Sequence, residues 1–344
     1  RNPPARRLSV PFSPCSVNTY PTDPTSMARR KVLFMESGSG MGGSSAALFY
    51  LLTYLDRSRF DPVVAYYFFN SGSHTKQIRQ LGIPVVFLDS KRSGLPHFLS
   101  SRPSPWALRW LGTPLRFFLR AMLFDLPQLC KLLRFLRREA VELIVLNNDV
   151  HYHLPAALAA RLARIPCVCR KAGGLGEGHR IKRLLTPCVD LFIAISTVTA
   201  RDQRDHNPST KRLVLLQPGV DLKRFTPAPP RPDLRLELGV PPGWKIVASV
   251  GRFHPGKGQR ELIEAASLIV QKYRDVSFLI VGDEVPASGG VKSSLEYRVQ
   301  QLGLSRNVIF TGWREDMNDL LRIVDVFVHC PTTSLEALGI ANHA

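Results

Sequence analysis

The chain of 344 residues is long enough for two domains of ordinary size, and its 44% hydrophobic content is typical of a globular protein. Its 46 Lys and Arg against 27 Asp and Glu give a net charge of +19, which favours anionic partners such as nucleic acid, acidic membrane or phosphorylated substrates, unless the surplus is only a basic, solvated surface. Six scattered cysteines without a C-x-x-C pair exclude a disulfide scaffold and favour a reducing, cytoplasmic setting, and the absence of any run of about 18 uncharged apolar residues argues against a transmembrane helix.

Residues 1–26 are rich in Pro, Ser and Thr and show neither helical nor strand periodicity. They also lack the continuous apolar core of a secretory signal. Met27 is followed by the sequence ARRKVLFM and has the context of a translation start. We therefore expect residues 1–26 to be a disordered or untranslated leader that lies outside the fold.

A literal G-x-G-x-x-G, in the stretch ESGSGMGGSS, follows the first expected strand, Lys31–Met35, and precedes an apolar helix candidate, Ala46–Leu55. Glycines allow close approach of a ligand to the backbone, and a helix N-terminus presents free N–H groups to an anion. A dinucleotide fingerprint also needs an acidic residue at the end of the second strand, where this chain has the sequence NSG at residues 70–72. The sequence therefore argues against NAD binding. It remains compatible with a Gly42-Gly43 turn that lies beside a phosphate.

Short apolar, β-rich runs alternate with helical segments such as Leu154–Arg164 and Gln259–Tyr273. Strands that are apolar on both faces and alternate with helices predict parallel sheets covered by helices. The proline-dense stretch Thr226–Lys245 separates two such series and is typical of a domain entry. The expected strands are Lys31–Met35, Pro62–Phe69, Pro84–Leu88, Leu143–Leu146, Cys167–Arg170, Leu191–Ile195, Leu213–Leu216, Ile246–Val250, Ser277–Val281, Val308–Thr311 and Val324–His329.

The fold class predicted from this alternation is α/β, with two Rossmann-like, doubly wound domains. We place the first at residues 27–220 and the second at residues 221–344. Ligands of such sheets bind at the carboxyl ends of the strands, so a cleft between the two domains is the expected site. Cys167 and Cys169 alternate along an expected strand, which indicates buried thiols more than metal ligands.

The insert at residues 91–140 has ten Lys or Arg against two acidic residues, and aromatic residues are interleaved with them. Cationic heads beside aromatic rings suit an anionic membrane surface. The alternative is a pair of ordinary amphipathic helices packed on the sheet with a basic face outward. Charge alone would also permit nucleic-acid binding, but the chain carries no recognised motif for it, so we expect no nucleic-acid partner.

The sequence VGRFHPGKG supplies the strongest chemical signal. Arg252 follows directly on Gly251 at the end of a strand, and Lys257 comes five residues later, before a helix. Two cations on a glycine-containing loop at that position can hold a diphosphate and stabilise the negative charge that grows when it leaves. A solvated basic loop is the competing interpretation.

At this point the chain resembles the family-four glycosyltransferases of GT-B fold, which belong to the type called glycosyl transferases group 1. The sequence LQPGVDLKRFTP resembles that family's P-x-G-V-D-x-x-x-F-x-P entry to the donor domain, and VGRFHPGKG matches its G-R-x-x-x-x-K-G loop. FLIVGD, VIFTGWRED and VDVFVHCPTTSLEALGIA follow in the family's order, and MGGSSAALFYLL occupies the place of its N-terminal Gly-Gly loop.

The resemblance implies a retaining transfer of a sugar from a nucleotide-diphosphate donor to an acceptor hydroxyl, with no metal and no cofactor besides that co-substrate. Arg252 and Lys257 would bind the diphosphate and support its departure, and Glu336 would contact the sugar hydroxyls as the third catalytic residue. The donor-binding residues implied by the resemblance are Gly42, Gly43, Gly251, Arg252, Lys257, Gly312, Trp313 and Glu336, with Gly312 and Trp313 near the base.

The acceptor side is less defined by the sequence. Asp149, His151 or His153, which follow a strand, could contact the acceptor hydroxyl, or could serve only as a helix cap or in packing. Lys171 or Arg180, which lie at the two ends of a glycine-rich stretch, could meet an anionic acceptor. We expect a glycan or lipid-linked acceptor of cell-envelope, lipopolysaccharide or exopolysaccharide synthesis, and a cytoplasmic enzyme that can lie peripherally on the inner face of the plasma membrane.

The sequence departs from the family at its end. The second glutamate of the family's pair, which would hold the donor ribose, should fall at position 344, and that residue is Ala344. We therefore expect a donor domain that is truncated. The alternative to an active transferase is an inactive, truncated relative that acts as a membrane-associated binding module.

Overall fold

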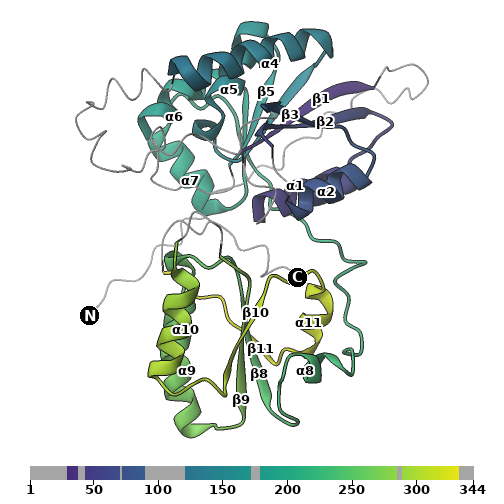
Figure 1. Cartoon of the computed structure of the whole chain (residues 1–344). Helices are drawn as coiled ribbons and strands as arrows, with labels where there is room; N and C mark the ends of the chain where they lie inside the picture. The colour runs from purple at the N-terminus through teal and green to yellow at the C-terminus, as the bar shows by residue number, and fades with distance from the viewer. Residues whose placement is uncertain are drawn as a thin grey trace, which may run out of the picture.

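The computed structural model of the chain describes residues 29–37, 43–69, 72–89, 121–171, 179–284 and 289–332. Within them the chain forms two α/β lobes, each built on its own sheet (Figure 1). All strand pairs in both sheets are parallel. The carboxyl ends of the strands in each sheet therefore lie at one edge, which is where ligands of such folds bind.

The first sheet has seven strands in the order β3-β2-β1-β4-β5-β6-β7. The chain extends the sheet first to one side of β1 and then to the other, so the order reverses between β1 and β4. That reversal is the topological switch point at which doubly wound sheets form a crevice. The strands are β1 (Arg30–Glu36), β2 (Phe60–Phe68), β3 (Val85–Asp89), β4 (Leu143–Asn147), β5 (Cys167–Lys171), β6 (Leu191–Ala194) and β7 (Leu213–Leu215).

Helices cover both faces of this sheet because its strands are apolar on both sides. On one face, α1 (Gly43–Thr53) and α2 (Ser73–Gln80) bury Leu48, Leu52 and Ile78 against the strands. On the other, α4 (Leu126–Arg138), α5 (Leu154–Ala163) and α6 (His179–Leu185) bury leucine and alanine side chains. The π-helical turn η3 (Ala121–Asp125) leads into α4, the 3₁₀ turn η4 (Val150–His153) leads into α5, the 3₁₀ turn η5 (Thr186–Cys188) follows α6, and α7 (Thr197–His206) follows β6.

The second sheet has four strands in the order β10-β9-β8-β11. One face packs against α9 (Gln259–Lys272) and α10 (Val291–Gln301), and the other against α8 (Leu234–Glu237) and α11 (Met317–Ile323) (Figure 1). A 3₁₀ turn, η6 (Pro255–Lys257), lies between β8 and α9. The strands are β8 (Lys245–Val250), β9 (Val276–Val281), β10 (Val308–Gly312) and β11 (Val326–Phe327).

The α/β fold class with two Rossmann-like sheets is confirmed, and a strand lies at each of the eleven expected places, although β11 is shorter than the expected Val324–His329. Cys167 and Cys169 are fully buried thiols, and burial raises the pKa of Cys167 to about 12. In the basic insert, α4 buries Leu132 and Leu136 against the sheet, as an amphipathic helix would. Residues 91–120 of that insert lie outside the described residues. In the part of the chain that the structure describes, no helix is both long and apolar enough to cross a membrane.

Candidate functional site

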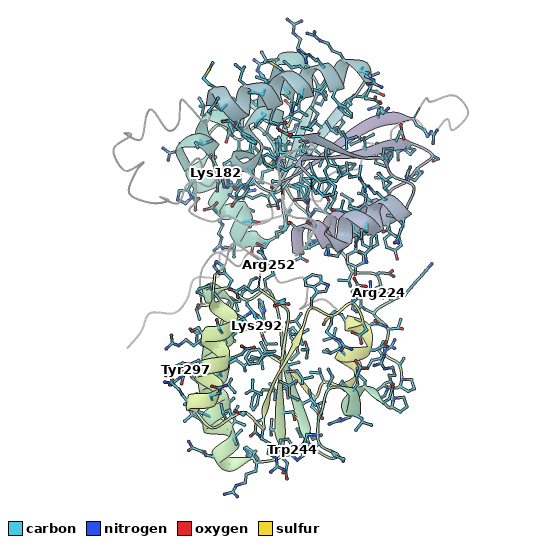
Figure 2. All side chains as sticks on the ribbon, in the orientation of Figure 1. Lys182, Arg224, Trp244, Arg252, Lys292 and Tyr297 are labelled. Carbon is cyan, nitrogen blue, oxygen red and sulfur yellow. The ribbon has the colours of Figure 1, made fainter. Side chains whose placement is uncertain are left out.

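The carboxyl ends of the strands in the second lobe point toward the first lobe. Figure 2 shows Arg252, which follows β8, at the edge of the lower lobe nearest the upper one, and Trp244, which precedes β8, at the opposite edge. Arg224, from the segment that joins the lobes, is also drawn at the level of the gap (Figure 2). Arg252, one of the residues expected to bind the donor diphosphate, therefore lies on the side of the second lobe that is nearest the first lobe.

The loop after β8 is anchored at both ends, while its Arg252 side chain stays exposed and Lys257 is half-buried. Phe253 is fully buried and forms a bridge to Glu284, and the buried Gln259 donates its Nε2 to the Arg252 carbonyl at 2.9 Å. A methyl group placed on Gly251 would lie 3.9 Å from Lys257 Cδ, so the lysine stem runs back past the end of the strand. Arg252 and Lys257 thus belong to one short, fixed loop.

Glycines stand at the ends of three neighbouring strands, where the backbones approach closely. The N–H of Gly251 donates to Val281 at 2.9 Å, and the N–H of Gly282 donates to Gly312 at 3.0 Å. Gly282 has φ +134°, and a Cβ there would lie 2.1 Å from the Gly251 carbonyl oxygen. Gly258, with φ +78°, has equally little room, because its Cβ would lie 1.8 Å from the Cys330 carbonyl oxygen. The loop can keep this shape only with glycine at both places.

The loop after β10 carries Trp313, whose side chain is 42% exposed. Its neighbours are held firmly: Arg314 donates to Asp316 at 2.7 Å, and Arg224 Nη2 donates to the Glu315 carbonyl at 2.6 Å. An accessible indole on a fixed loop offers a flat surface on which a base could stack.

Two of the donor residues implied by the sequence, Gly42 and Glu336, lie outside the described residues. Gly43 is described and begins α1. The roles of all the donor residues remain predictions.

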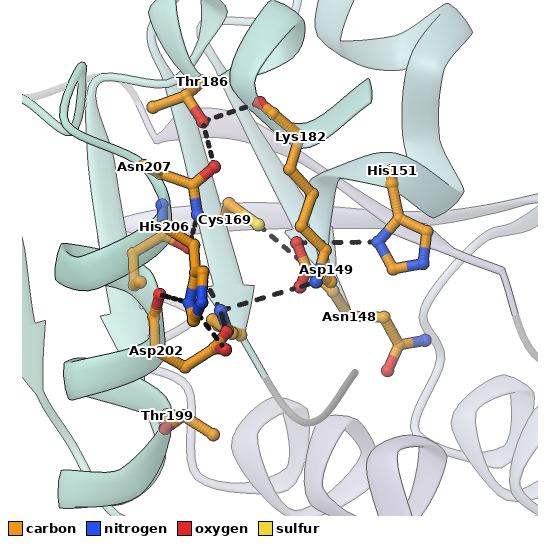
Figure 3. A network of polar contacts seen from close by, with 12 residues as sticks. Asn148, Asp149, His151, Cys169, Lys182, Thr186, Thr199, Asp202, His206 and Asn207 are labelled. Atoms are coloured by element: carbon orange, nitrogen blue, oxygen red, sulfur yellow. Dashed lines mark hydrogen bonds and ion pairs between the residues drawn. The ribbon is translucent and has the colours of Figure 1, made fainter. Parts of the chain in front are cut away.

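The first lobe has a buried charge network at the carboxyl edge of its sheet (Figure 3). Asp149, just beyond β4, lies 2.8 Å through Oδ2 from Lys182 Nζ and 3.9 Å from Lys171 Nζ. His151 Nδ1 lies 3.7 Å from Asp149 Oδ1. Burial by itself would raise the pKa of the Asp149 carboxyl, but His151 and the charges of Lys182 and Lys171 together hold that pKa below its ordinary value. Asp149 is therefore ionised at neutral pH.

The network reaches α7 through Lys171, which pairs with Asp202 and donates to Gln203 Oε1 at 3.3 Å. Lys171 is fully buried, so its ammonium is committed to these carboxylates and faces no open surface. Lys182 and Asp202 are members of this set that sequence reasoning missed. They lie 33 and 53 residues beyond Asp149 on separate helices, so no local spacing indicates the contact.

The two histidines have different surroundings. His153 is fully buried, its Nε2 lies 3.2 Å from the Asn147 carbonyl, and its ring packs against Tyr67. Burial lowers the pKa of His153 to about 4, so its ring is neutral at neutral pH. The His151 side chain is 12% exposed, and of the acceptor-side candidates whose side chains the structure describes it is the one that is not fully covered. The described residues include no group of three or more His, Cys, Asp or Glu arranged to hold a metal ion.

Comparison with known families places two sequence models on the chain. The model described as Glycosyltransferase Family 4 matches residues 41–224, and the one described as Glycosyl transferases group 1 matches residues 230–343. The resemblance to family-four glycosyltransferases inferred from the sequence motifs is therefore confirmed, because each lobe is matched by one of these two models.

Two curated relatives illustrate the likeness. The UDP-Gal:alpha-D-GlcNAc-diphosphoundecaprenol alpha-1,3-galactosyltransferase of Escherichia coli is 29% identical over 224 residues, which cover 60% of this chain and 56% of the relative. The GDP-mannose-dependent monoacylated alpha-(1-6)-phosphatidylinositol monomannoside mannosyltransferase of Corynebacterium glutamicum is 35% identical over 174 residues, covering 48% of this chain and 44% of the relative. The chain thus spans about half the length of these relatives.

Solved structures share the fold. The Anabaena protein HepE, solved with UDP and glucose, superposes with a TM-score of 0.69 at 22% identity, over 89% of this chain and 76% of that one. The sucrose-phosphate synthase of Thermosynechococcus elongatus superposes with a TM-score of 0.66 at 15% identity, over 91% and 77%. The two-lobed GT-B architecture expected from the sequence is confirmed by this likeness.

Proposed function

We propose that this chain, which belongs to glycosyltransferase family 4, moves a sugar from a nucleotide-diphosphate donor to an acceptor hydroxyl. The observation that carries the proposal is the fixed loop after β8, which presents the cations Arg252 and Lys257 beside close-packed glycine backbone at the carboxyl edge of a Rossmann-like sheet. That arrangement suits a diphosphate, whose charge needs cations and whose oxygens need close approach to backbone.

In the proposed reaction, the acceptor oxygen forms a bond to the anomeric carbon while the bond from that carbon to the diphosphate oxygen breaks. The acceptor proton passes to the departing diphosphate, and the sugar keeps its anomeric configuration, as the family resemblance implies. Negative charge accumulates on the diphosphate as it leaves, and Arg252 and Lys257 stabilise that charge more than they stabilise the bound donor. Catalysis would come from this stabilisation and from positioning of the two substrates.

The donor class that we propose is a UDP-hexose. The Anabaena structures contain UDP and UDP-glucose, and the Escherichia coli relative is named for UDP-Gal. GDP-mannose is the competing donor, because the Corynebacterium glutamicum relative is named for it. Trp313 would lie near the base in either case.

The acceptor that we propose is a lipid-linked glycan of the cell envelope. Both curated relatives are named for lipid-linked acceptors, one a diphosphoundecaprenol and the other a phosphatidylinositol mannoside. A cytoplasmic protein would meet an anionic membrane surface through η3 and α4, where Met122, Leu123 and Leu126 are exposed near the start and Arg134 and Arg137 are exposed further along α4.

The experiment that tests the function is transfer by the full chain from labelled UDP-glucose, UDP-galactose and GDP-mannose to a polyprenol-diphosphate-linked GlcNAc. We expect a labelled lipid product with one donor, loss of at least about 100-fold in kcat/KM for Arg252→Ala, and little change for Arg274→Ala. Arg274 is an exposed arginine at the amino end of β9 and is a matched control. Donor binding without transfer would favour the inactive binding module. If the chain showed no donor binding and no transfer, the proposal would be rejected.

A further inference from the structure

A second buried polar cluster lies at the switch point of the first sheet, where β1 and β4 end side by side. Glu36 and Asn147 are register partners across these strands, and Glu36 is fully buried. Asn147 Nδ2 donates to Glu36 Oε2, and Asn148 Nδ2 donates to Glu36 Oε1 at 3.1 Å. The same carboxylate therefore accepts from two consecutive asparagines.

Two consecutive side chains of a strand normally point to opposite faces of the sheet. Asn148 departs from this alternation because its φ is +116°, a backbone conformation that residues other than glycine seldom adopt. The turn brings its amide to the same side as that of Asn147. The strained conformation is thus what allows both amides to reach Glu36.

Each amide also has a second partner, and the two partners flank the glycine stretch. Asn148 Nδ2 donates to Ser37 Oγ at 3.0 Å, directly after β1, and Asn147 Nδ2 donates to the Ser44 carbonyl at 3.2 Å, in the first turn of α1. Arg170 Nη1 donates to Asn147 Oδ1 at 2.6 Å, which fixes the amide so that its NH₂ group faces Glu36 and Ser44. We call Glu36, Asn147, Asn148 and Arg170 the amide clamp.

We propose that the amide clamp positions the first turn of α1 for the donor, and that Asn148 is its key positioning residue. This inference rests on the proposed function. Asn148 would act through Ser37 and Glu36 and would not itself touch the substrate. Asn148 would fix the end of β1 and the Glu36 carboxylate, and Asn147, which is held by that carboxylate, would fix Ser44 at the start of α1. The backbone N–H groups at the start of α1 would then need no reordering when the diphosphate arrives.

The strained backbone supplies a test that separates positioning from stability. Asn148→Gly removes one hydrogen-bond donor to the buried Glu36 but relieves the unfavourable φ, so we expect the two effects on stability to offset each other and the melting temperature to stay close to that of the wild type. We expect UDP to bind about tenfold more weakly or worse, because hydrogen bonds that order the site are lost, and the KM for the UDP-hexose to rise with little change in kcat. Ala140→Gly is the matched control, since Ala140 also has positive φ, +49°, and lies between α4 and β4 at the opposite edge of the sheet.

The readouts are calorimetric binding of UDP and thermal unfolding of the full chain. Ala140→Gly should leave UDP affinity unchanged, and Asn148→Asp, which sets a second carboxylate against Glu36, should weaken UDP binding as Asn148→Gly does. If Asn148→Gly bound UDP with an affinity within twofold of the wild type, this inference would be overturned and the proposed function would stand. Failure of the wild type to bind any nucleotide would overturn the proposed function, and the inference with it.

Discussion

Lys182 Nζ lies 2.8 Å from Asp149 Oδ2, and both side chains are only 1% exposed. The pair joins α6 to the end of β4, with Lys171 and Asp202 completing a set of two cations and two anions. Taking such charges out of water is costly, so the set is stable only while every charge keeps a partner.

Removing one member should therefore destabilise the first lobe. We expect Lys182→Met to lower the free energy of unfolding by about 3 kcal/mol, near the lower end for a broken buried pair because Lys171 still lies near Asp149. Urea unfolding measures the loss. Lys211→Met, which breaks the exposed pair with Asp190, is the control and should cost less than about 1 kcal/mol. If Lys182→Met lost no more unfolding free energy than Lys211→Met, the buried pair of Lys182 and Asp149 would not contribute to the stability of the first lobe.

The burial of His153 predicts a pH dependence of stability. The folded pKa of about 4 lies below the ordinary value of 6.5, so the unfolded chain takes up this proton first as the pH falls. The folded state should lose up to about 3 kcal/mol between pH 6.5 and pH 4 from this group, at no more than about 1.4 kcal/mol per pH unit. Above pH 6.5 the contribution is fully present.

His153→Gln isolates the effect, because Gln can donate to the Asn147 carbonyl and does not titrate. The difference in unfolding free energy between the wild type and this variant, followed from pH 7 to pH 4, should shrink as the pH falls. Parallel curves for the two proteins would mean that His153 keeps an ordinary pKa in the fold.

Much of this architecture could be predicted from the sequence, because strands buried on both faces produce short, continuous apolar runs that alternate with helices. Arg252 and Lys257 could be singled out for the same kind of reason, since strand, glycine, cation and helix follow one another within one stretch. The roles of those residues as donor ligands stay predictions.

The polar clusters of the first lobe could not be predicted in this way. Glu36 ends β1 and reads as a solvated residue at a strand end, and its amide partners lie 111 and 112 residues away. Two histidines two residues apart would share a face in a strand, but they lie in the 3₁₀ turn η4, where residues two apart point in different directions. His153 consequently faces the core, while His151 is not fully covered.

The backbone contact between Gly282 and Gly251 yields a prediction about the donor lobe. Gly282→Ala should cost about 2–4 kcal/mol, because the methyl group would lie 2.1 Å from the Gly251 carbonyl and force β8 and β9 apart. Gly303→Ala is the matched control: it also has positive φ, +68°, but nothing lies within 4 Å of its Cβ position, so it should cost only about 1–2 kcal/mol.

Chemical denaturation compares these two variants. The Gly282→Ala protein should also bind UDP more weakly, because Gly251 carries Arg252 with it when it moves. Equal losses of unfolding free energy for the two variants would contradict the close contact between Gly282 and the Gly251 carbonyl.

The most direct test of the account compares UDP with uridine as calorimetric ligands of the wild type and of Arg252→Ala/Lys257→Ala. Both ligands share the base and ribose, and only UDP carries the diphosphate. If the two cations bind the diphosphate, the double variant should lose about 100-fold or more in affinity for UDP and little for uridine. An unchanged UDP affinity, or an equal loss for both ligands, would contradict the claim that the loop after β8 holds the leaving group.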